Sequence, residues 1–440
     1  MTKKSQAYYR FCHDMSQGKF SYYEPEEIQD AVMDLMDDGN REDALLLAEE
    51  GKKQHPDDEE MDKLVIWMYI HNNRTEEAAS LFEKYRNDNQ DSSLCLKFSL
   101  EVLKGDPDKA LKTFFASLKD GAVGPTEWLN TIDEMFETIP SHLLPKWLAK
   151  AVPFVKKAEE MGRIGGFLMD CCQFKQAADV LEKALDIDAY DIYSWQDLAR
   201  CYMELKEDDR SLEACTYGLA INDQNPLLHF ISGYICSNKN DYKQSIEHLE
   251  MVRQYAEGKM QSKMFSLPKD ELYQQISVAY SLLGHAYIET EQFEKARECY
   301  ECLYLREPAN MEAILQLVTV EMMIGDSPKA AEYIIQALER NPKDSIVLSM
   351  YVSIMTTMHR FDEALEGLRN LIRIKPRSHN YQLAYAELLL HCKKTEEADK
   401  AFRKLLASKP RQGTVLEALT IYFESIDDNA ALQQINELKK

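Results

Sequence analysis

The chain has 440 residues, of which 45% are hydrophobic and 29% charged, and it contains only 16 glycines and 14 prolines. This composition is typical of a well-packed helical protein and excludes a largely disordered chain. The formal net charge of −23 opposes binding to the phosphates of nucleic acids and to anionic membrane surfaces, so we expect neither as a partner.

Residues 1–24 are expected to form an N-terminal capping segment, with a short helix followed by a stretch that ends before Pro25. Such a segment covers the apolar face that a terminal repeat would otherwise expose to water. The side chains expected to supply the covering surface are aromatic: Tyr8, Tyr9, Phe11, Tyr22 and Tyr23.

Targeting signals are not apparent in the sequence. The first residues lack the apolar run that forms the core of a signal peptide. The uncharged, apolar-rich stretch from Ser345 to Met358 is too short to span a bilayer. We therefore expect a cytoplasmic protein that does not insert into a membrane.

Residues 25–124 are predicted to hold acidic helical repeats. Two blocks of 34 residues, Pro25–Asp58 and Glu59–Ser92, carry alanine at block position 20, and a shortened third unit extends to about residue 124. Between Glu24 and Asp62 there are 16 acidic residues and only three basic ones, a net charge of −13. Such a field favours a basic partner, although a solvated acidic face that only maintains solubility is the simpler explanation.

The middle of the chain is less regular. Residues 125–157 contain four prolines and are interpreted as a degenerate helical unit or as a flexible joint between two arrays. Three further repeats are expected over 158–259. An insertion follows at 260–276, where the segment Ser266-Leu-Pro268 indicates the start of a helix.

Four consecutive blocks of 34 residues occupy 277–412. An alanine and a proline recur at fixed block positions: Ala296, Ala330, Ala364 and Ala398, and Pro308, Pro342, Pro376 and Pro410. Small residues let two antiparallel helices approach closely. Proline lacks an amide hydrogen and cannot continue a helix, so each proline should follow the end of a second helix. The period predicts two helices and two turns in each block.

The first of these blocks reads Tyr280-Ser-Leu-Leu-Gly-His-Ala-Tyr287, with alanine, tyrosine and proline further along. This pattern resembles the tetratricopeptide repeat (TPR). The resemblance is strong over 277–412, fair over 158–259 and weak in the amino-terminal third. It implies an all-α, right-handed superhelical solenoid of tandem helix-turn-helix repeats, with C-terminal capping helices at 413–440.

The resemblance also implies a function, because members of this family bind protein or peptide partners. Positions 2, 5, 9, 12 and 13 of each repeat line the concave groove in the family. The residues of this chain at such positions form the expected partner-binding groove: Tyr193, Gln196, Arg200, Phe230, Tyr234, Ser281, His285, Thr319, Ser353, Asn380 and Glu387. Their aromatic and hydrogen-bonding side chains would hold an extended or helical peptide, and a solvated inner wall is the alternative.

One subclass of the family grips acidic carboxyl tails through lysine, arginine and asparagine at groove positions. The corresponding residues here include Gln196, Arg200, Tyr234 and His285, so that clamp is not reproduced.

Catalytic motifs are not evident in the sequence. It contains no phosphate-binding glycine loop, His-Glu-x-x-His helix or Gly-x-Ser-x-Gly turn, so we expect no enzyme activity and no cofactor. The Cys299-Tyr-Glu-Cys302 motif lacks the second pair of ligands that a zinc site needs, so no metal is expected. The leading interpretation is a non-catalytic scaffold or adaptor. A sensor that changes superhelix shape on capturing a signalling peptide, or a substrate-recruiting subunit of an enzyme complex, are the alternatives.

Overall fold

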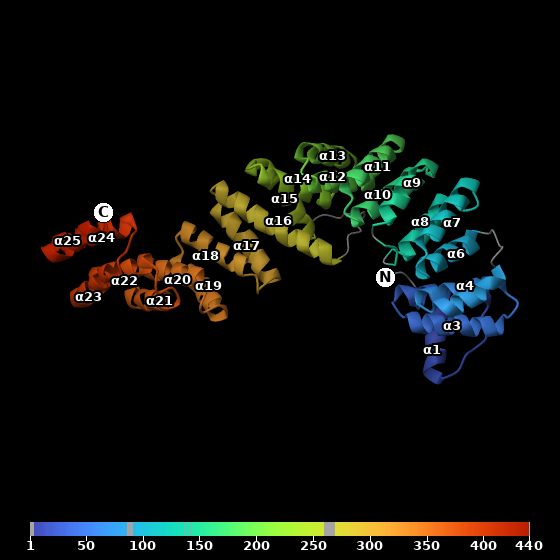
Figure 1. The fold of residues 1–440 in the computed structure, drawn as a ribbon, viewed down its shortest axis with the longest axis horizontal. Coiled ribbons are helices and arrows are strands. Elements are labelled where there is room, and N and C mark those ends of the chain that lie inside the picture. Colours follow the sequence, from blue (N-terminus) through green and yellow to red (C-terminus); the bar gives the residue numbers. More distant parts are fainter. Residues whose placement is uncertain (1–3, 86–90, 137, 141, 259–268, 440) are drawn as a thin grey trace. The chain divides into compact units, whose positions relative to one another are not determined.

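The computed structural model describes residues 4–85, 91–136, 138–140, 142–258 and 269–439. These residues form α-helices joined by short turns, with two 3-10 helices and no strand among them (Figure 1). Nor does any helix among the described residues combine the length and apolarity needed to cross a membrane. The helices belong to two compact units, Met1–Asp223 and Gln224–Lys440.

The first unit contains helices α1 to α13, in which neighbouring helices pack as antiparallel pairs. Their bounds are α1 Gln6–Gln17, α2 Pro25–Asp37, α3 Arg41–Gln54, α4 Glu59–His71, α5 Thr75–Phe82, α6 Asp91–Leu103, α7 Pro107–Asp120, α8 Pro125–Glu134, α9 Leu144–Ala151, α10 Ala158–Asp170, α11 Phe174–Ile187, α12 Ile192–Glu204 and α13 Asp208–Ile221. The 3-10 helices Glu83–Tyr85 and Val152–Phe154 follow α5 and α9 directly.

The second unit contains helices α14 to α25. Their bounds are α14 Pro226–Asn238, α15 Tyr242–Ala256, α16 Lys269–Glu289, α17 Phe293–Arg306, α18 Met311–Ile324, α19 Ser327–Arg340, α20 Ser345–Thr357, α21 Phe361–Ile374, α22 His379–His391, α23 Thr395–Ala407, α24 Gly413–Ser425 and α25 Asn429–Leu438. The helix start expected at Ser266-Leu-Pro268 lies outside the described residues.

The chain is thus an all-α solenoid of helix pairs, and side-chain caps set where the first helices begin. Asn225, Asn310 and Asp344 accept hydrogen bonds from backbone amides in the first turns of α14, α18 and α20. These contacts satisfy amide groups that have no partner within the helix. The second helices α17, α19, α21 and α23 each end two or three residues before the recurring proline, as the period predicts.

The seam between the two helices of a repeat is filled at the predicted alanines. Ala296, Ala330, Ala364 and Ala398 are all fully buried. In the first of these blocks, the glycine of the Leu-Gly pair also has a steric role. A methyl group at Gly284 of α16 would lie 2.7 Å from ring carbons of Tyr300 on α17, and Tyr300 is itself buried. The packing of α16 on α17 therefore requires a residue without a side chain at this position.

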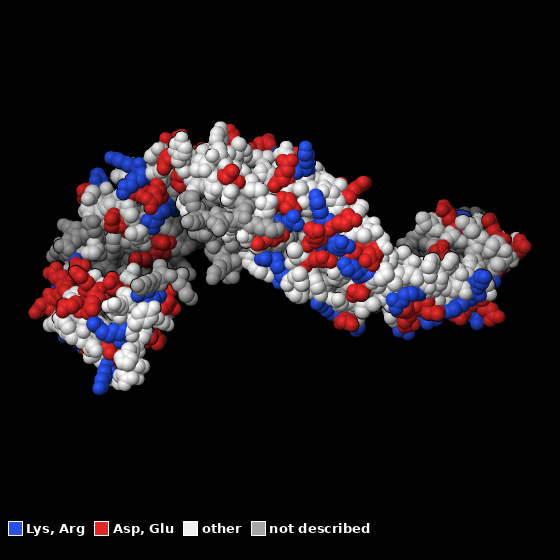
Figure 2. Space-filling model, turned by 180° about the vertical axis from the view of Figure 1, so that it is seen from behind, with Lys and Arg blue, Asp and Glu red and all other residues white. Residues whose placement is uncertain are grey.

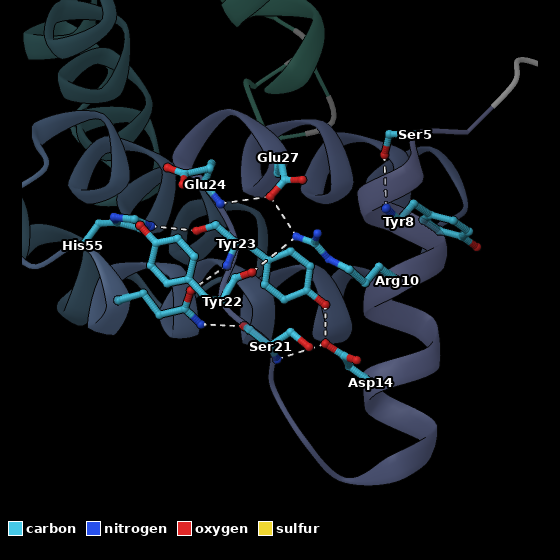
Figure 3. Close-up of polar contacts among 11 residues, drawn as sticks. Ser5, Tyr8, Arg10, Asp14, Ser21, Tyr22, Tyr23, Glu24, Glu27 and His55 are labelled. Atoms are coloured by element: carbon cyan, nitrogen blue, oxygen red, sulfur yellow. Dashed lines mark hydrogen bonds and ion pairs between the residues drawn. The ribbon is translucent and has the colours of Figure 1, made fainter.

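Helix α1 and the segment after it pack on the first repeat through two buried aromatic side chains. Phe11 and Tyr23 are buried, whereas Tyr9 and Tyr22 stay about 60% exposed. The hydroxyl of Tyr23 donates to a carboxylate oxygen of Asp14 at 2.6 Å, and the Ser21 amide donates to the same oxygen at 2.9 Å (Figure 3). The hydrogen bond from Tyr23, helped by Ser21, lowers the pKa of Asp14 below its ordinary value.

Helix α3 holds the same segment from the other side. The side-chain amide of Gln54 accepts from the Tyr23 amide and donates to the Ser21 carbonyl, both at 3.0 Å. A ring nitrogen of His55 lies 2.7 Å from the Tyr23 carbonyl. Tyr23 is thus fixed by its backbone as well as by its side chain.

We expect Tyr23→Phe to lower the free energy of unfolding by about 1–3 kcal/mol at neutral pH, because Asp14 would stay buried without its hydroxyl donor. The depressed pKa of Asp14 contributes stability above its unfolded-state value of about 4, and this contribution is lost as the pH falls through the folded-state pKa. Urea unfolding at a series of pH values should therefore show the difference from wild type shrinking below about pH 4. The matched control is Tyr22→Phe, at the exposed neighbouring tyrosine, and an equal loss there would contradict the prediction.

We expect Gly284→Ala to destabilise the second unit by about 1–3 kcal/mol, since the added methyl group would collide with Tyr300 although alanine is the better helix former. Gly166→Ala in α10 is the control, because a methyl group there meets no atom within 4 Å. That change should be neutral or stabilising by up to about 1 kcal/mol. Thermal unfolding followed by circular dichroism tests both, and a Gly284→Ala protein as stable as wild type would refute the steric argument.

Candidate functional site

The first helices of consecutive repeats in the first unit enclose a cavity of about 330 Å³. Its lining comes from α2, α4, α6 and α8, and we call it the amino-terminal groove. It is lined by Gln29, Met33, Glu60, Lys63, Leu64, Trp67, Ser92, Cys95, Leu96, Ser99, Thr131 and Glu134. Four helices are needed to form it, so the groove exists only when the repeats are stacked.

Trp67 is the largest side chain in the groove, and it is half-buried. Its indole nitrogen donates to a carboxylate oxygen of Glu134 at 2.8 Å. The ring of His71 lies against the indole with the ring centroids 4.3 Å apart and the planes at 63°. A ring nitrogen of His71 is 3.7 Å from the same oxygen of Glu134. These contacts hold the indole in one orientation, with part of its surface open to solvent.

The groove has one covered lysine and exposed carboxylates at its border. The side chain of Lys63 is only 5% exposed, and its ammonium group lies 3.1 Å from a carboxylate oxygen of Glu60, which is itself 60% exposed. Glu134 is also exposed, and so is Met33. The groove therefore presents an apolar surface bordered by carboxylates, while its one cation is largely covered.

The surrounding surface is acidic as well. Acidic side chains crowd the amino-terminal helices, at the lower left of Figure 2. Part of this charge is neutralised, because Lys4 lies 3.1 Å from Asp38 and Arg10 lies 2.7 Å from Glu27. Arg74 similarly pairs with Glu49 at 3.1 Å.

Three of the predicted groove residues lie on α12 in the first unit. Tyr193 is exposed, Gln196 is buried and Arg200 is half-buried. A guanidinium nitrogen of Arg200 lies 3.8 Å from a carboxylate oxygen of Asp197 on the same helix. Of these three residues, only Tyr193 is exposed.

The other predicted residues lie in the second unit. Phe230 is buried and Tyr234 half-buried, and their ring centroids are 6.3 Å apart. His285 is exposed, with its ring 5.8 Å from that of Tyr242. Ser281 lines a cavity of about 390 Å³ formed by α16, α17 and α18.

The remaining predicted residues are spread over α18, α20 and α22. Thr319 is half-buried and donates to the Leu315 carbonyl, and Ser353 accepts at its carbonyl from Thr357. Ser353, Asn380 and Glu387 are exposed.

The predicted set omits the amino-terminal groove, although the same positional rule finds it. Positions 2, 5 and 9 of the blocks at Pro25 and Glu59 include five residues that line the cavity: Gln29, Met33, Glu60, Lys63 and Trp67. The aromatic residue and Leu-Gly pair that identify the register are missing from the first helix of the block at Pro25. The register of the block at Pro25 is therefore indicated mainly by the alanine and the proline in its second half.

The groove is lined by side chains suited to binding another molecule. Among the described residues, no group of three or more His, Cys, Asp or Glu side chains is placed to hold a metal ion. The chemistry that the groove offers is apolar contact, ring stacking and attraction of cations by its carboxylates.

Family models for the tetratricopeptide repeat match the chain at residues 30–92 and 277–310. The first match covers α3, α4, α5 and most of α2, and the second covers the block with the Leu-Gly pair. Comparison with curated proteins gives no match. The chain therefore contains tetratricopeptide repeats at these residues, and repeats of this kind generally serve as a scaffold for protein interactions.

Comparison with solved structures gives partial similarities. YrrB, described as a TPR protein with an unusual peptide-binding site, is 18% identical with a TM-score of 0.38, over 49% of this chain and 99% of YrrB. MamA is 19% identical with a TM-score of 0.35, over 42% of this chain and 92% of MamA. Pseudomonas aeruginosa pilF is 18% identical with a TM-score of 0.37, over 52% of this chain and 97% of pilF.

Proposed function

We propose that this protein is a non-catalytic scaffold that binds a basic peptide segment of a partner protein, and that the amino-terminal groove is its main binding site. The observation that carries the proposal is the half-exposed indole of Trp67, held by Glu134 beneath a border of exposed carboxylates. Aromatic side chains that are fixed and partly open are the usual anchors of protein interfaces.

The groove chemistry favours a particular kind of segment. An apolar side chain of the partner would pack on Trp67, Leu64 and Met33, which supply apolar surface. A lysine or arginine next to it in the partner would reach Glu60 or Glu134, or lie over the indole face. The acidic surface of the amino-terminal helices would attract such a segment before contact is made.

The groove residues predicted on α12 and in the second unit extend this proposal. Tyr193 in the first unit, and separately Tyr234 and His285 in the second unit, would contact further segments of a partner. The exposed rings of Tyr193 and His285 and the half-buried ring of Tyr234 suit extended peptide chains.

A phage library of random twelve-residue peptides, selected on the full chain, tests the proposal. We expect the enriched peptides to carry an aromatic or aliphatic residue flanked by lysine or arginine. Trp67→Ala should weaken their binding about tenfold or more, as measured by fluorescence anisotropy with synthetic peptides.

Trp67 also contributes to the core of the first unit, so a second variant is needed. Met33→Ser removes an apolar contact at a side chain that is 51% exposed, and its matched control is Met323→Ser, at a methionine of α18 that is 49% exposed. Binding weakened at Met33 and unchanged at Met323 supports the groove. Enriched peptides that are acidic, or that lose affinity only with Met323→Ser, would refute the assignment.

A further inference from the structure

Another cavity, of about 550 Å³, lies within the second unit between α21, α22 and α23. It differs from the amino-terminal groove in its construction, because its charged side chains come from the second helices of two consecutive repeats. Helix α22 supplies Gln382, Tyr385 and Leu389. The groove positions of the family lie on first helices, so this cavity is a separate site.

Four cations border the cavity, and Glu397 is the one acidic residue of its lining. Arg369 and Arg373 are one turn apart on α21, and Lys400 and Lys404 are one turn apart on α23. Each pair therefore lies along one face of its helix. This local excess of positive charge is opposite in sign to the net charge of −23 of the whole chain.

The arginines make contacts with neighbouring side chains, whereas the lysines do not form ion pairs within the part of the chain that the structure describes. Arg369 donates from Nε to the Tyr385 hydroxyl at 3.1 Å, and another of its nitrogens lies 3.2 Å from Glu366. Arg373 donates to the side-chain oxygen of Asn370 at 3.0 Å. The two lysines are exposed, and no ion pair to either is found among the described residues. One wall is thus positioned by the protein, while the other offers two uncompensated cations.

The interior of the cavity is apolar. Leu389 and Leu405 lie at its buried end, and Ile372 and Ala401 contribute further apolar surface. A small anion such as phosphate would pair with the cations but would leave this surface in contact with water. A nucleic acid strand would need cations along an extended stripe, whereas these four surround one cavity.

We propose that this cavity binds an acidic peptide segment in which one apolar side chain is flanked by aspartate or glutamate. The apolar side chain enters between Leu389 and Leu405, and the carboxylates on either side pair with Lys400, Lys404 and the arginines of α21. The site is independent of the basic segment assigned to the amino-terminal groove, so either assignment can fail without the other.

The test uses a fluorescein-labelled ten-residue peptide with one central leucine flanked by aspartate and glutamate, titrated with the full chain and followed by anisotropy. Lys400→Glu/Lys404→Glu should weaken binding about tenfold or more. The matched control is Lys243→Glu/Lys343→Glu, which makes the same change in net charge at two exposed lysines of the second unit that do not line the cavity. Equal weakening by both double variants would overturn the proposal, because it would show a response to net charge alone.

Altered peptides and inorganic phosphate test the contributions of the carboxylates and of the leucine to binding. Replacing the peptide's carboxylates by amides, or its leucine by serine, should each weaken binding about tenfold, while millimolar inorganic phosphate should displace little of the peptide. A peptide that binds equally well without its leucine and is fully displaced by phosphate would show a site for small anions and overturn the proposal. A single-stranded RNA whose binding depends on the same two lysines would also overturn it.

Discussion

The close approach of two helices within each repeat is the constraint on which this structure depends. It is possible only where small side chains occupy the seam, as the buried alanines and Gly284 do. The recurring prolines stop each second helix near the same point, so that the next pair begins in register. Both proposed binding sites depend on this stacking. One cavity is lined by the first helices of four consecutive repeats, and the other by the three successive helices α21, α22 and α23.

Much of the fold could be predicted from the sequence, because the same residue types recur at the same helix contacts every 34 residues. Ala296 and its equivalents mark the seam, and Pro308 and its equivalents mark the helix ends, so the period alone indicates paired helices. The contact between Tyr23 and Asp14 could not be predicted in this way. It joins a helix to an irregular segment that occurs once, and no periodic signal connects the two residues.

The candidate sites were less predictable for a similar reason. The positional rule of the family reaches Trp67 only if the register of the block at Glu59 is known, and the usual first-helix signature is missing from the block before it. Nothing in the sequence indicates that the cations of the cavity at Lys400 lie close together. Arg369 and Lys400 resemble ordinary solvated residues of amphipathic helices, and only the stacking of α21 on α22 and α23 brings them to one cavity.

Each of the two cavities is confined to a few neighbouring helices within one unit. In a repeat array, substitutions at sites that share no neighbours have nearly additive effects on stability. A substitution in one cavity should therefore hardly change the stability of the helices that form the other. Selection could therefore have altered the charge and shape of the cavity at Trp67 without altering the one at Lys400. A chain built in this way can exchange one partner for another during evolution while keeping the rest of its contacts.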